Sequence, residues 1–309
     1  MRIFQERLFK LRNEPHALQR FVLRRYLFTT LERLGIHAVG DHFYEPIPNL
    51  VWLEKHYDDS QKFFPASSDW DFSAMEQRAL AAIATYGGEF REEADKRGYR
   101  ENCYFQKWDA LCLYTYLRSN KIRCVVEIGQ GFSTLVTLAA LGRNRRDNGI
   151  ATRLISIDPY ARADSQQSTL DRTEATVIRQ TVQDTGAAEI LPFLGDDCLL
   201  FVDSSHVFKV GSDVEFLQKK VYPLIPSGCH LHVHDIYSPY PWPRENYVSQ
   251  KWFWNEQELL EQFLAFNSQF SMQLAAYWLF KESSALKLRV AEFGPDYAVE
   301  GTSLYLRRH

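Results

Sequence analysis

Residues 124–141, CVVEIGQGFSTLVTLAAL, decide the fold that the rest of the chain must join. The apolar run from Cys124 to Ile128 predicts a buried strand, and the apolar segment from Ser133 predicts a helix. Between them, the turn Gly129-Gln130-Gly131 allows the backbone to reverse sharply and to approach a ligand closely. Strand, glycine turn and helix in this order predict a βα corner of the nucleotide-binding kind.

Two details separate this corner from the dinucleotide fingerprint G-x-G-x-x-G. The third glycine is absent, because Thr134 occupies its place. Glu127 stands at the end of the strand, where its charge would repel a pyrophosphate and would suit a ligand with hydroxyls, an ammonium or a sulfonium group. An NAD-dependent oxidoreductase would need the missing glycine, and a buried strand-turn-helix with no ligand is the plain alternative.

The size of the chain allows one large domain or one domain with an appendage, since 45% of its 309 residues are hydrophobic. Its 36 basic and 39 acidic residues leave a net charge of -3, which favours neither nucleic acid nor an anionic membrane as a partner. No apolar run reaches the roughly 18 residues of a membrane span, and the basic start lacks a signal-peptide pattern. The five cysteines form no C-x-x-C pair, so we expect buried thiols and a cytoplasmic protein.

After residue 120, apolar strands and helical segments alternate, which predicts a mostly parallel sheet covered on both faces. We therefore expect an α/β protein with a Rossmann-like, doubly wound sheet of seven strands. The expected strands are 124–128, 153–158, 176–182, 198–203 and 229–235, with a last pair near 270–280 and 302–307. The expected helices include 133–143, 213–224 and 255–267, whereas residues 286–292 fit either a strand or part of a hairpin.

The first 100 residues follow a different pattern, so we divide the chain into an N-terminal cap region, residues 1–100, and a ligand-binding domain, residues 101–309. Residues 16–35 fit a basic amphipathic helix and residues 73–98 fit a second helix, with aromatic residues concentrated between them. We expect a mainly helical cap over a ligand pocket; a small helical subdomain that only packs on the sheet is the alternative. The basic helix offers a face to a partner chain, so a homo-oligomer stays open.

Polar residues follow the first three expected strands, at the edge where an open parallel sheet binds ligands. Gly129 and Gly131 follow the first strand. Asp158 ends the second, where a carboxylate can accept both hydroxyls of a ribose. Gln183 and Asp184 follow the third strand, in a position to read an adenine edge. Acids and glycines at three successive strand ends predict one cofactor site there.

The fourth and fifth expected strands end in acids and histidines. CLLFVD ends in Asp203 and leads to His206, and CHLHVHDI ends in His234 and Asp235. If these strands are neighbours, the carboxylates and an imidazole converge and can hold a divalent cation. Imidazole titrates near neutrality, which suits His206 to remove a proton from a hydroxyl. A capping or core histidine is the alternative for His206, and a zinc site on H-x-H-x-H, residues 230–234, is a further one.

The segment from about Phe105 to Asn267 resembles the class I S-adenosylmethionine-dependent methyltransferases, through EIGQGFS, DSSHVFKVGSD, HVHDI and WNEQELL. Its layout is similar to that of the metal-dependent catechol and macrolide-sugar O-methyltransferases. The resemblance implies that S-adenosylmethionine binds at Glu127, Gly129, Gln130, Gly131, Ser133, Asp158, Asp184 and Asp203. It implies Mg²⁺ or another divalent metal on Asp203, His234 and Asp235, with His206 as the catalytic base. Because His234 stands where those enzymes have a carboxylate, metal identity and metal dependence stay open.

The resemblance implies a methyltransferase for a hydroxyl of a small natural product or a sugar. The loop YSPYPWPRENYVSQKWFW supplies aromatic residues that we expect to wall the acceptor site: Tyr237, Tyr240, Trp242, Trp252 and Trp254. A stiff surface loop is the alternative for this segment. Alternatives for the whole chain are an N-methyltransferase without metal, a binding protein that keeps the fold without catalysis, and a metal-dependent hydrolase. The expected partner is a small-molecule acceptor, not nucleic acid or membrane.

Overall fold

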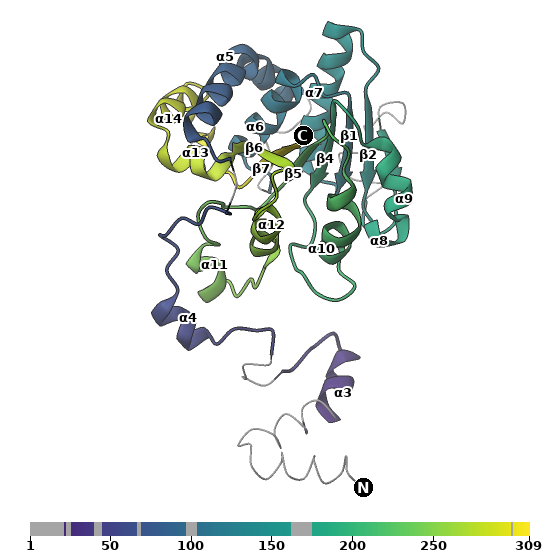
Figure 1. Ribbon diagram of the computed structural model, residues 1–309, viewed down its shortest axis with the longest axis vertical. Helices are drawn as coiled ribbons and strands as arrows, with labels where there is room; N and C mark the ends of the chain where they lie inside the picture. The colour runs from purple at the N-terminus through teal and green to yellow at the C-terminus, as the bar shows by residue number, and fades with distance from the viewer. Residues whose placement is uncertain are drawn as a thin grey trace. The chain divides into compact units, whose positions relative to one another are not determined.

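The structure is a computed structural model that describes residues 22, 26–39, 45–66, 69–96, 104–161, 175–297 and 299–309. The chain divides into two compact units, residues 1–58 with 244–253, and residues 59–243 with 254–309 (Figure 1). The boundary predicted at residue 100 lies inside the second unit, and the assignment of a cap stays a prediction. Of the helix predicted at 16–35, residues 16–21 and 23–25 lie outside the described residues, and Phe28–Glu32 is helical.

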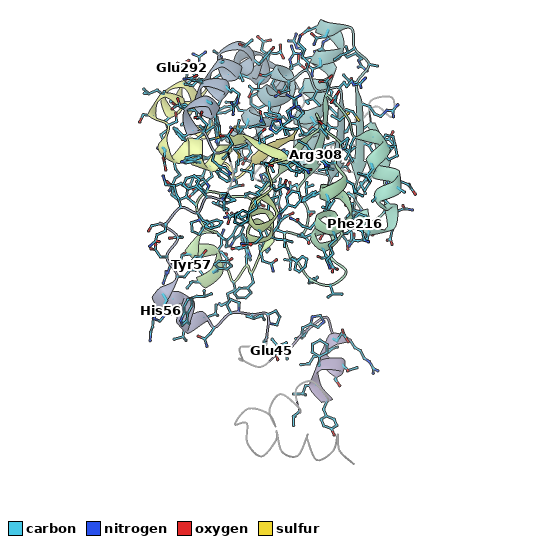
Figure 2. All side chains as sticks on the ribbon, viewed as in Figure 1. Glu45, His56, Tyr57, Phe216, Glu292 and Arg308 are labelled. Carbon is cyan, nitrogen blue, oxygen red and sulfur yellow. The ribbon has the colours of Figure 1, made fainter. Side chains whose placement is uncertain are left out.

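Among its described residues, the first unit contains the short helices α3 (Phe28–Glu32), α4 (Leu50–His56) and α11 (Arg244–Val248). Asn49 caps α4, because its side chain accepts a hydrogen bond from the backbone amide of Trp52 at 2.9 Å. Arg244 donates to the carbonyl of Glu54. Tyr57, labelled in Figure 2, meets the ring of Tyr247 edge to face at 5.1 Å. These contacts join α4 to α11 across nearly 190 residues of sequence.

Seven strands form one sheet in the second unit, in the order β3-β2-β1-β4-β5-β7-β6. Among them only β7 runs antiparallel to its neighbours. This arrangement confirms the predicted Rossmann-like, doubly wound and mostly parallel sheet. The strands are β1 (Cys124–Ile128), β2 (Arg153–Ile157), β3 (Ala175–Ile178), β4 (Cys198–Val202), β5 (His230–Val233), β6 (Phe270–Ala275) and β7 (Leu304–Arg308).

The three longest helices of the described residues lie together. α5 (Phe72–Lys96), α6 (Lys107–Ser119) and α7 (Phe132–Asn148) pack together beside the sheet (Figure 1). α7 ends at Gly149, whose φ of 65° lies in the left-handed region that a C-terminal cap favours. No helix in the part of the chain that the structure describes is both long and apolar enough to cross a bilayer.

Short helices complete the second unit: α8 (Val182–Thr185), α9 (Ala187–Ile190), α10 (Asp213–Phe216), α12 (Glu256–Leu264), α13 (Ala276–Glu282) and α14 (Ser284–Ala291). Three elements differ from those predicted. The strand expected at 270–280 ends at Ala275 and becomes α13. Residues 286–292 lie mostly in α14, because the Ser283 side chain accepts the amide of Leu286 and starts a helix. The helix expected at 213–224 is α10 followed by a π turn at 217–221 and a 3-10 turn at 222–224, where Pro223 has no amide hydrogen to donate.

The cysteines of the sheet behave as small core residues, as their sequence positions predict. Cys124 of β1 lies opposite Cys198 of β4 in the sheet register, and the thiol of Cys229 contacts the carbonyl of Cys198. Cys198 and Cys229 are buried, whereas Cys124 is half-buried. Burial raises the pKa of Cys229 to about 12, so this thiol stays protonated and unreactive at neutral pH.

One glycine lets the loops after β1 and β4 lie against each other. Strand order reverses at β1, whose neighbours are β2 and β4, so the loops after these strands share one edge. Gly129 has a φ of +91°, and a Cβ atom there would lie 1.9 Å from the carbonyl oxygen of Asp203. Only glycine fits both the backbone conformation and the space.

Replacement of Gly129 by alanine should therefore destabilise the protein by roughly 1–3 kcal/mol, from left-handed strain and overlap with Asp203. Gly131→Ala is the control, because its φ is -159° and a Cβ atom there would meet no other atom within 4 Å. The control should lose at most about 1 kcal/mol of helix capping. Urea unfolding measures the free energy of unfolding of both variants. Equal losses of stability would show that the close approach of Gly129 to Asp203 is not needed.

Candidate functional site

A pocket of about 370 Å³ opens at the carboxyl ends of β1, β2 and β4. Gly129, Asp158 and Asp203, which follow these strands, all line it. Gln183 of α8 and Asp213 of α10 close its sides. The structure thus brings three of the predicted site residues to a single cavity, at the edge that the alternation of strands and helices predicted.

Asp158 joins two loops of this pocket. Its Oδ2 accepts the backbone amide of Gln130 at 2.8 Å, and its Oδ1 accepts the amide of Tyr160 at 2.6 Å. The carboxylate therefore fixes the glycine turn after β1 relative to the loop after β2. Because Asp158 still lines the cavity, its remaining lone pairs are available to a ligand.

Glu127 does not line the pocket but is fully buried behind the glycine turn. Its two carboxylate oxygens accept the hydroxyls of Ser133 at 3.0 Å and Thr134 at 2.7 Å. Burial raises the pKa of Glu127 to about 8, although the hydroxyls of Thr134 and Ser133 act in the opposite direction. Glu127 and Ser133 thus hold β1 against the start of α7, which supports the turn from behind.

The sequence predicted Asp184 at the end of the third strand, but in the structure it lies in α8. β3 ends at Ile178, and Thr181 begins the short helix α8 by accepting the amide of Asp184 at 3.1 Å. The Asp184 carboxylate in turn accepts the Thr181 hydroxyl at 2.7 Å, so it belongs to the helix cap. Its neighbour Gln183 lines the pocket instead. Gln130 and Gly131 lie in the turn but are not among the residues that line the cavity.

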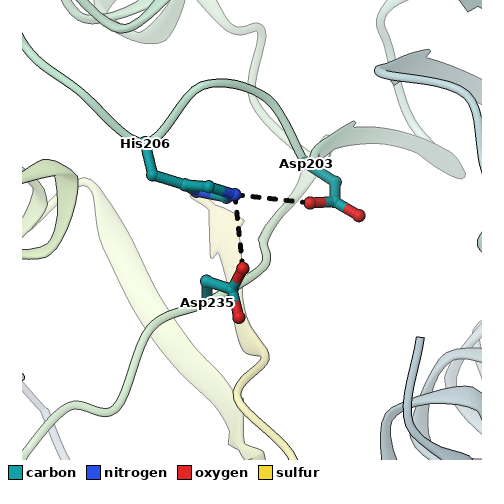
Figure 3. Close-up of side chains that lie close together, drawn as sticks. All are labelled: Asp203, His206 and Asp235. Atoms are coloured by element: carbon teal, nitrogen blue, oxygen red, sulfur yellow. Dashed lines mark ion pairs between the residues drawn. The ribbon is translucent and has the colours of Figure 1, made fainter. Parts of the chain in front are cut away.

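Two aspartates and two histidines meet beside the pocket, at the ends of β4 and β5. His206 Nε2 lies 3.5 Å from Asp203 Oδ1 and 3.3 Å from Asp235 Oδ2, as Figure 3 shows. His234 Nδ1 lies 3.4 Å and 3.5 Å from the same two oxygens. The sequence predicted this convergence, with His234 as the ligand. In the structure His206, predicted only as a base, is as close to both carboxylates as His234.

Each of these two histidines has a second, buried carboxylate behind it. His206 Nδ1 lies 2.9 Å from Glu256 Oε2, and His234 Nε2 lies 3.6 Å from Asp109 Oδ2. Glu256 and Asp109 are fully or almost fully buried, whereas Asp203 and Asp235 keep 32% and 23% of their side-chain surface exposed. The two aspartates are therefore the solvent-facing part of the cluster. Asp109, which no motif marks, was not predicted from the sequence, and no role was predicted for Glu256 although it lies in the W-N-E-Q motif.

The charges of the cluster shift one another's titration. Burial lowers the pKa of His206, but hydrogen bonds and attraction from Asp203, Glu256 and Asp235 outweigh it and raise the pKa to about 10. Burial also lowers the pKa of His234, but attraction from Asp235 and Asp203 and a hydrogen bond with Asp109 outweigh it and raise that pKa. Burial alone would raise the pKa of Asp203, but attraction to His234 and His206 holds it well below its usual range. The carboxylates therefore favour the protonated form of both rings, and a cation bound between the aspartates would oppose it.

The backbone is strained at both strand ends of the cluster. His206 and Asp235 have φ values of 58° and 54°, in the left-handed region that costs a non-glycine residue about 1–3 kcal/mol. The carbonyl of His206 accepts the amides of Asn255 and Glu256, and Asp235 accepts the hydroxyl of Thr302 at 3.0 Å. Such strain persists only where the surroundings fix the backbone, and it is concentrated at functional sites.

The other two histidines of H-x-H-x-H are core residues. His232 stacks between the rings of Phe201 and Tyr305 at 4.2 Å and 4.0 Å, and His230 pairs with the Tyr116 hydroxyl at 2.6 Å. Burial lowers the pKa of both imidazoles. Among the residues that the structure describes, the only acidic or histidine group spaced for a metal is Asp203, His206 and Asp235. A zinc site on residues 230–234 is therefore not formed.

A row of aromatic rings leads away from His206. Trp254 packs on His206 with ring centroids 4.6 Å apart, Trp242 follows at 5.3 Å, and Tyr237 lies 5.1 Å from Trp242. These rings come from the loop that the sequence predicted as an acceptor wall. Tyr240 belongs to the same unit, whereas Trp252 belongs to the first unit.

Comparison with known proteins adds a family assignment for part of the chain. Residues 126–236, about a third of the chain, match a family described as a methyltransferase domain. An uncharacterized protein from Archaeoglobus fulgidus is 29% identical over 155 residues, which cover 46% of this chain and 67% of that protein. The matched family segment runs from β1 to the end of β5 and contains both the pocket and the acid–histidine cluster.

Similar solved structures include the SAH-bound methyltransferase PaMTH1 of Podospora anserina, at 15% identity over 91% of this chain and 96% of that one, with a TM-score of 0.40. The O-methyltransferase of Bacillus cereus in complex with SAH is 13% identical over 77% and 92%, with a TM-score of 0.42. Both TM-scores are too low for either structure to support a functional assignment for this chain. The family match does: residues 126–236 match a methyltransferase domain, which confirms the class that the motif resemblance implied.

The burial of Glu127 predicts a pH-dependent stability. Its pKa is about 8 in the folded protein and near its ordinary 4.5 in the unfolded chain, so the native state holds the extra proton between these values. Stability should thus fall as pH rises from about 5 to 8, by up to about 1.4 kcal/mol per pH unit. Glu127→Gln removes this titration. Urea unfolding of both proteins at several pH values should show the variant gaining on the natural protein as pH rises; a constant difference contradicts the assignment.

Proposed function

We propose that this methyltransferase domain uses S-adenosylmethionine to methylate a hydroxyl group of a small molecule, with assistance from a divalent cation. One observation supports this most: Asp203 belongs both to the pocket and to the acid–histidine cluster. A cofactor in the pocket and an acceptor at the cluster would therefore meet at one carboxylate, which is the arrangement that group transfer needs.

The residues of the pocket fit S-adenosylmethionine. The pocket volume of about 370 Å³ is within the range of small-molecule sites, and Gly129, which has no side chain, lines the pocket with its backbone. Asp158 offers carboxylate lone pairs to ribose hydroxyls, and Gln183 offers an amide to an adenine edge. Asp203 places a negative charge where the amino-acid end and the sulfonium would lie. When bound, S-adenosylmethionine supplies an electrophilic methyl group.

The cluster fits a divalent cation. Asp203 and Asp235 direct one oxygen each toward a common point, and both are exposed enough for a cation to reach them. With Asp109 and Glu256 behind, four carboxylates face two imidazoles, so negative charge remains even when both rings are protonated. Oxygen ligands suit Mg²⁺ or Mn²⁺, and an imidazole ligand, from His206 or His234, would shift the preference toward Mn²⁺, Fe²⁺ or Zn²⁺. When bound, such a cation lowers the pKa of an acceptor hydroxyl.

The residues around the acceptor would contribute a base, a wall and alignment. His206 Nε2 faces the point where the hydroxyl would lie, so it can take the proton. The rings of Trp254, Trp242 and Tyr237 would exclude water and pack on an apolar or cyclic acceptor. Holding the two reactants in contact lowers the barrier by about 7–11 kcal/mol in favourable cases.

A hydroxyl acceptor is favoured over an amine because of the paired aspartates. A neutral amine is already a nucleophile and needs no cation, whereas a hydroxyl gains most from a site that stabilises its ionised form. The acceptor class that we propose is a small natural product or a sugar. Methylation of amines only, with no response to cations, would instead point to the metal-free N-methyltransferase.

The pocket assignment predicts that S-adenosylhomocysteine binds and that Asp158→Ala weakens binding at least about tenfold, or about 1.4 kcal/mol. The variant loses both the ribose contact and the bridge to the glycine turn. Asp184→Ala is the matched control, because that carboxylate caps α8 outside the pocket and should leave affinity unchanged. Isothermal titration calorimetry measures all three proteins. No binding to the natural protein would refute the cofactor assignment.

The cation assignment predicts that Mn²⁺ or Mg²⁺ raises the melting temperature of the S-adenosylhomocysteine-bound protein and increases methyl transfer in a screen of hydroxyl-bearing acceptors. EDTA should reverse both effects. Asp235→Asn should abolish the cation effects, because it removes one charged ligand, but it should leave cofactor affinity within about twofold. Asp184→Ala should keep the full response. A response that survives in Asp235→Asn would place the cation elsewhere.

A further inference from the structure

Residues at the start of α12 contact three parts of His206. The backbone carbonyl of His206 accepts the amides of Asn255 at 3.1 Å and Glu256 at 3.2 Å. The ring nitrogen Nδ1 lies 2.9 Å from Glu256 Oε2. Trp254 packs against the imidazole face with 4.6 Å between ring centroids. Backbone, ring edge and ring face of one histidine are thus fixed by three consecutive residues.

The Glu256 carboxylate is committed to His206. The side chain is 2% exposed, so its charge has little access to water. Oε2 contacts His206, and Oε1 has no hydrogen-bond partner among the described residues. A buried carboxylate with a single partner costs free energy that packing alone does not return. Such a residue is more readily explained by what it does to its partner than by stability.

The contact decides which ring nitrogen of His206 faces the cluster. A carboxylate at Nδ1 accepts a proton from that nitrogen, so Nδ1 keeps its hydrogen in the neutral ring. The lone pair then lies on Nε2, which points toward Asp203 Oδ1 and Asp235 Oδ2. The opposite tautomer would leave Glu256 without a donor and would present an N–H to the acceptor. A carboxylate behind an imidazole is a common device for fixing both orientation and tautomer.

We propose that Glu256 is the positioning residue of the site: it holds the His206 ring so that Nε2, and not Nδ1, is directed at the point between Asp203 and Asp235. This inference rests on the proposed function for its consequence in catalysis. It holds whether Nε2 takes a proton from the acceptor or binds the cation, because both uses need the same lone pair in the same place.

The neighbours of Glu256 extend this role to the surrounding loops. The Asn255 side chain accepts the amide of Phe208 at 2.6 Å, and the Gln257 side chain accepts the amide of Tyr237 at 2.7 Å. Phe208 follows β4 and Tyr237 follows β5. Residues 254–257, the W-N-E-Q motif, therefore connect the two loops that contain the acid–histidine cluster, with Glu256 directed at its imidazole.

The test compares Glu256→Ala and Glu256→Gln with Glu261→Ala. Glu261 is the matched control, because it is a second buried carboxylate of α12, and its hydrogen bonds go to the Ser238 hydroxyl at 2.6 Å and to the Gln257 amide at 3.1 Å rather than to the cluster. Histidine is labelled with ¹⁵N, and the resonances of His206 are identified by their loss in His206→Asn. Circular dichroism and thermal unfolding establish that each variant is folded.

The natural protein and Glu261→Ala should both show a hydrogen-bonded His206 Nδ1–H that exchanges slowly with water. Glu256→Ala should lose this signal. Should Glu256→Ala fail to fold, Glu256→Gln, which keeps the volume but not the charge, should shift the same signal. A folded Glu256 variant with an unchanged His206 spectrum would overturn the proposal.

Kinetics test the consequence for catalysis, with the acceptor found in the hydroxyl screen. Glu256→Ala should lower kcat about 10- to 100-fold and leave the dissociation constant of S-adenosylhomocysteine within about twofold. Glu256→Asp should recover part of kcat, because a shorter carboxylate can still accept from Nδ1. Unchanged kcat in a variant that has lost the Nδ1–H signal would refute the catalytic role of Glu256, but it would not refute the proposed function. Absence of S-adenosylhomocysteine binding in the natural protein would instead refute the proposed function and leave the spectroscopic result intact.

Discussion

Compensation of buried charge is the constraint on which the site depends. His206, His234, Asp109 and Glu256 are nearly inaccessible to water, and each needs an opposite charge within reach. Leaving a buried member of such a pair unpartnered typically costs about 3–5 kcal/mol. The ends of β4 and β5 must therefore stay against α6 and α12, which contribute the two rear carboxylates. The half-buried Asp203 and Asp235 are then presented together at the surface.

The same edge of the sheet serves both halves of the site because β1 and β4 are neighbours. The backbone at Gly129 touches the carbonyl of Asp203, and the Asp203 side chain turns toward the imidazoles. Glu127, although acidic, acts from inside by holding Ser133 and Thr134. The contact of the two loops thus makes Asp203 common to the pocket and the cluster.

Much of this architecture was predictable from local pattern. Buried strands followed by glycine or aspartate predicted the sheet, and the acids at strand ends predicted the edge where Asp158, Asp203 and Asp235 lie. What the pattern could not give was tertiary pairing. Asp109 lies in α6 with no motif around it, and only the packing of α6 beside β5 brings it to His234. The prediction placed Asp184 at the end of a strand because of the apolar pattern before it. In the structure Thr181 starts a helix there, and Asp184 takes part in the helix cap.

The position of residues 255–257 has a consequence for how the chain can change in length. Consecutive residues at a helix start point about 100° apart, which is why Asn255, Glu256 and Gln257 reach three different places. A single insertion or deletion among residues 254–257 would rotate every following side chain away from its partner at once. Residues 249–253, which precede Trp254, contribute no side chain to the acid–histidine cluster. Natural length variation in relatives should therefore accumulate before the tryptophan and stop abruptly at it.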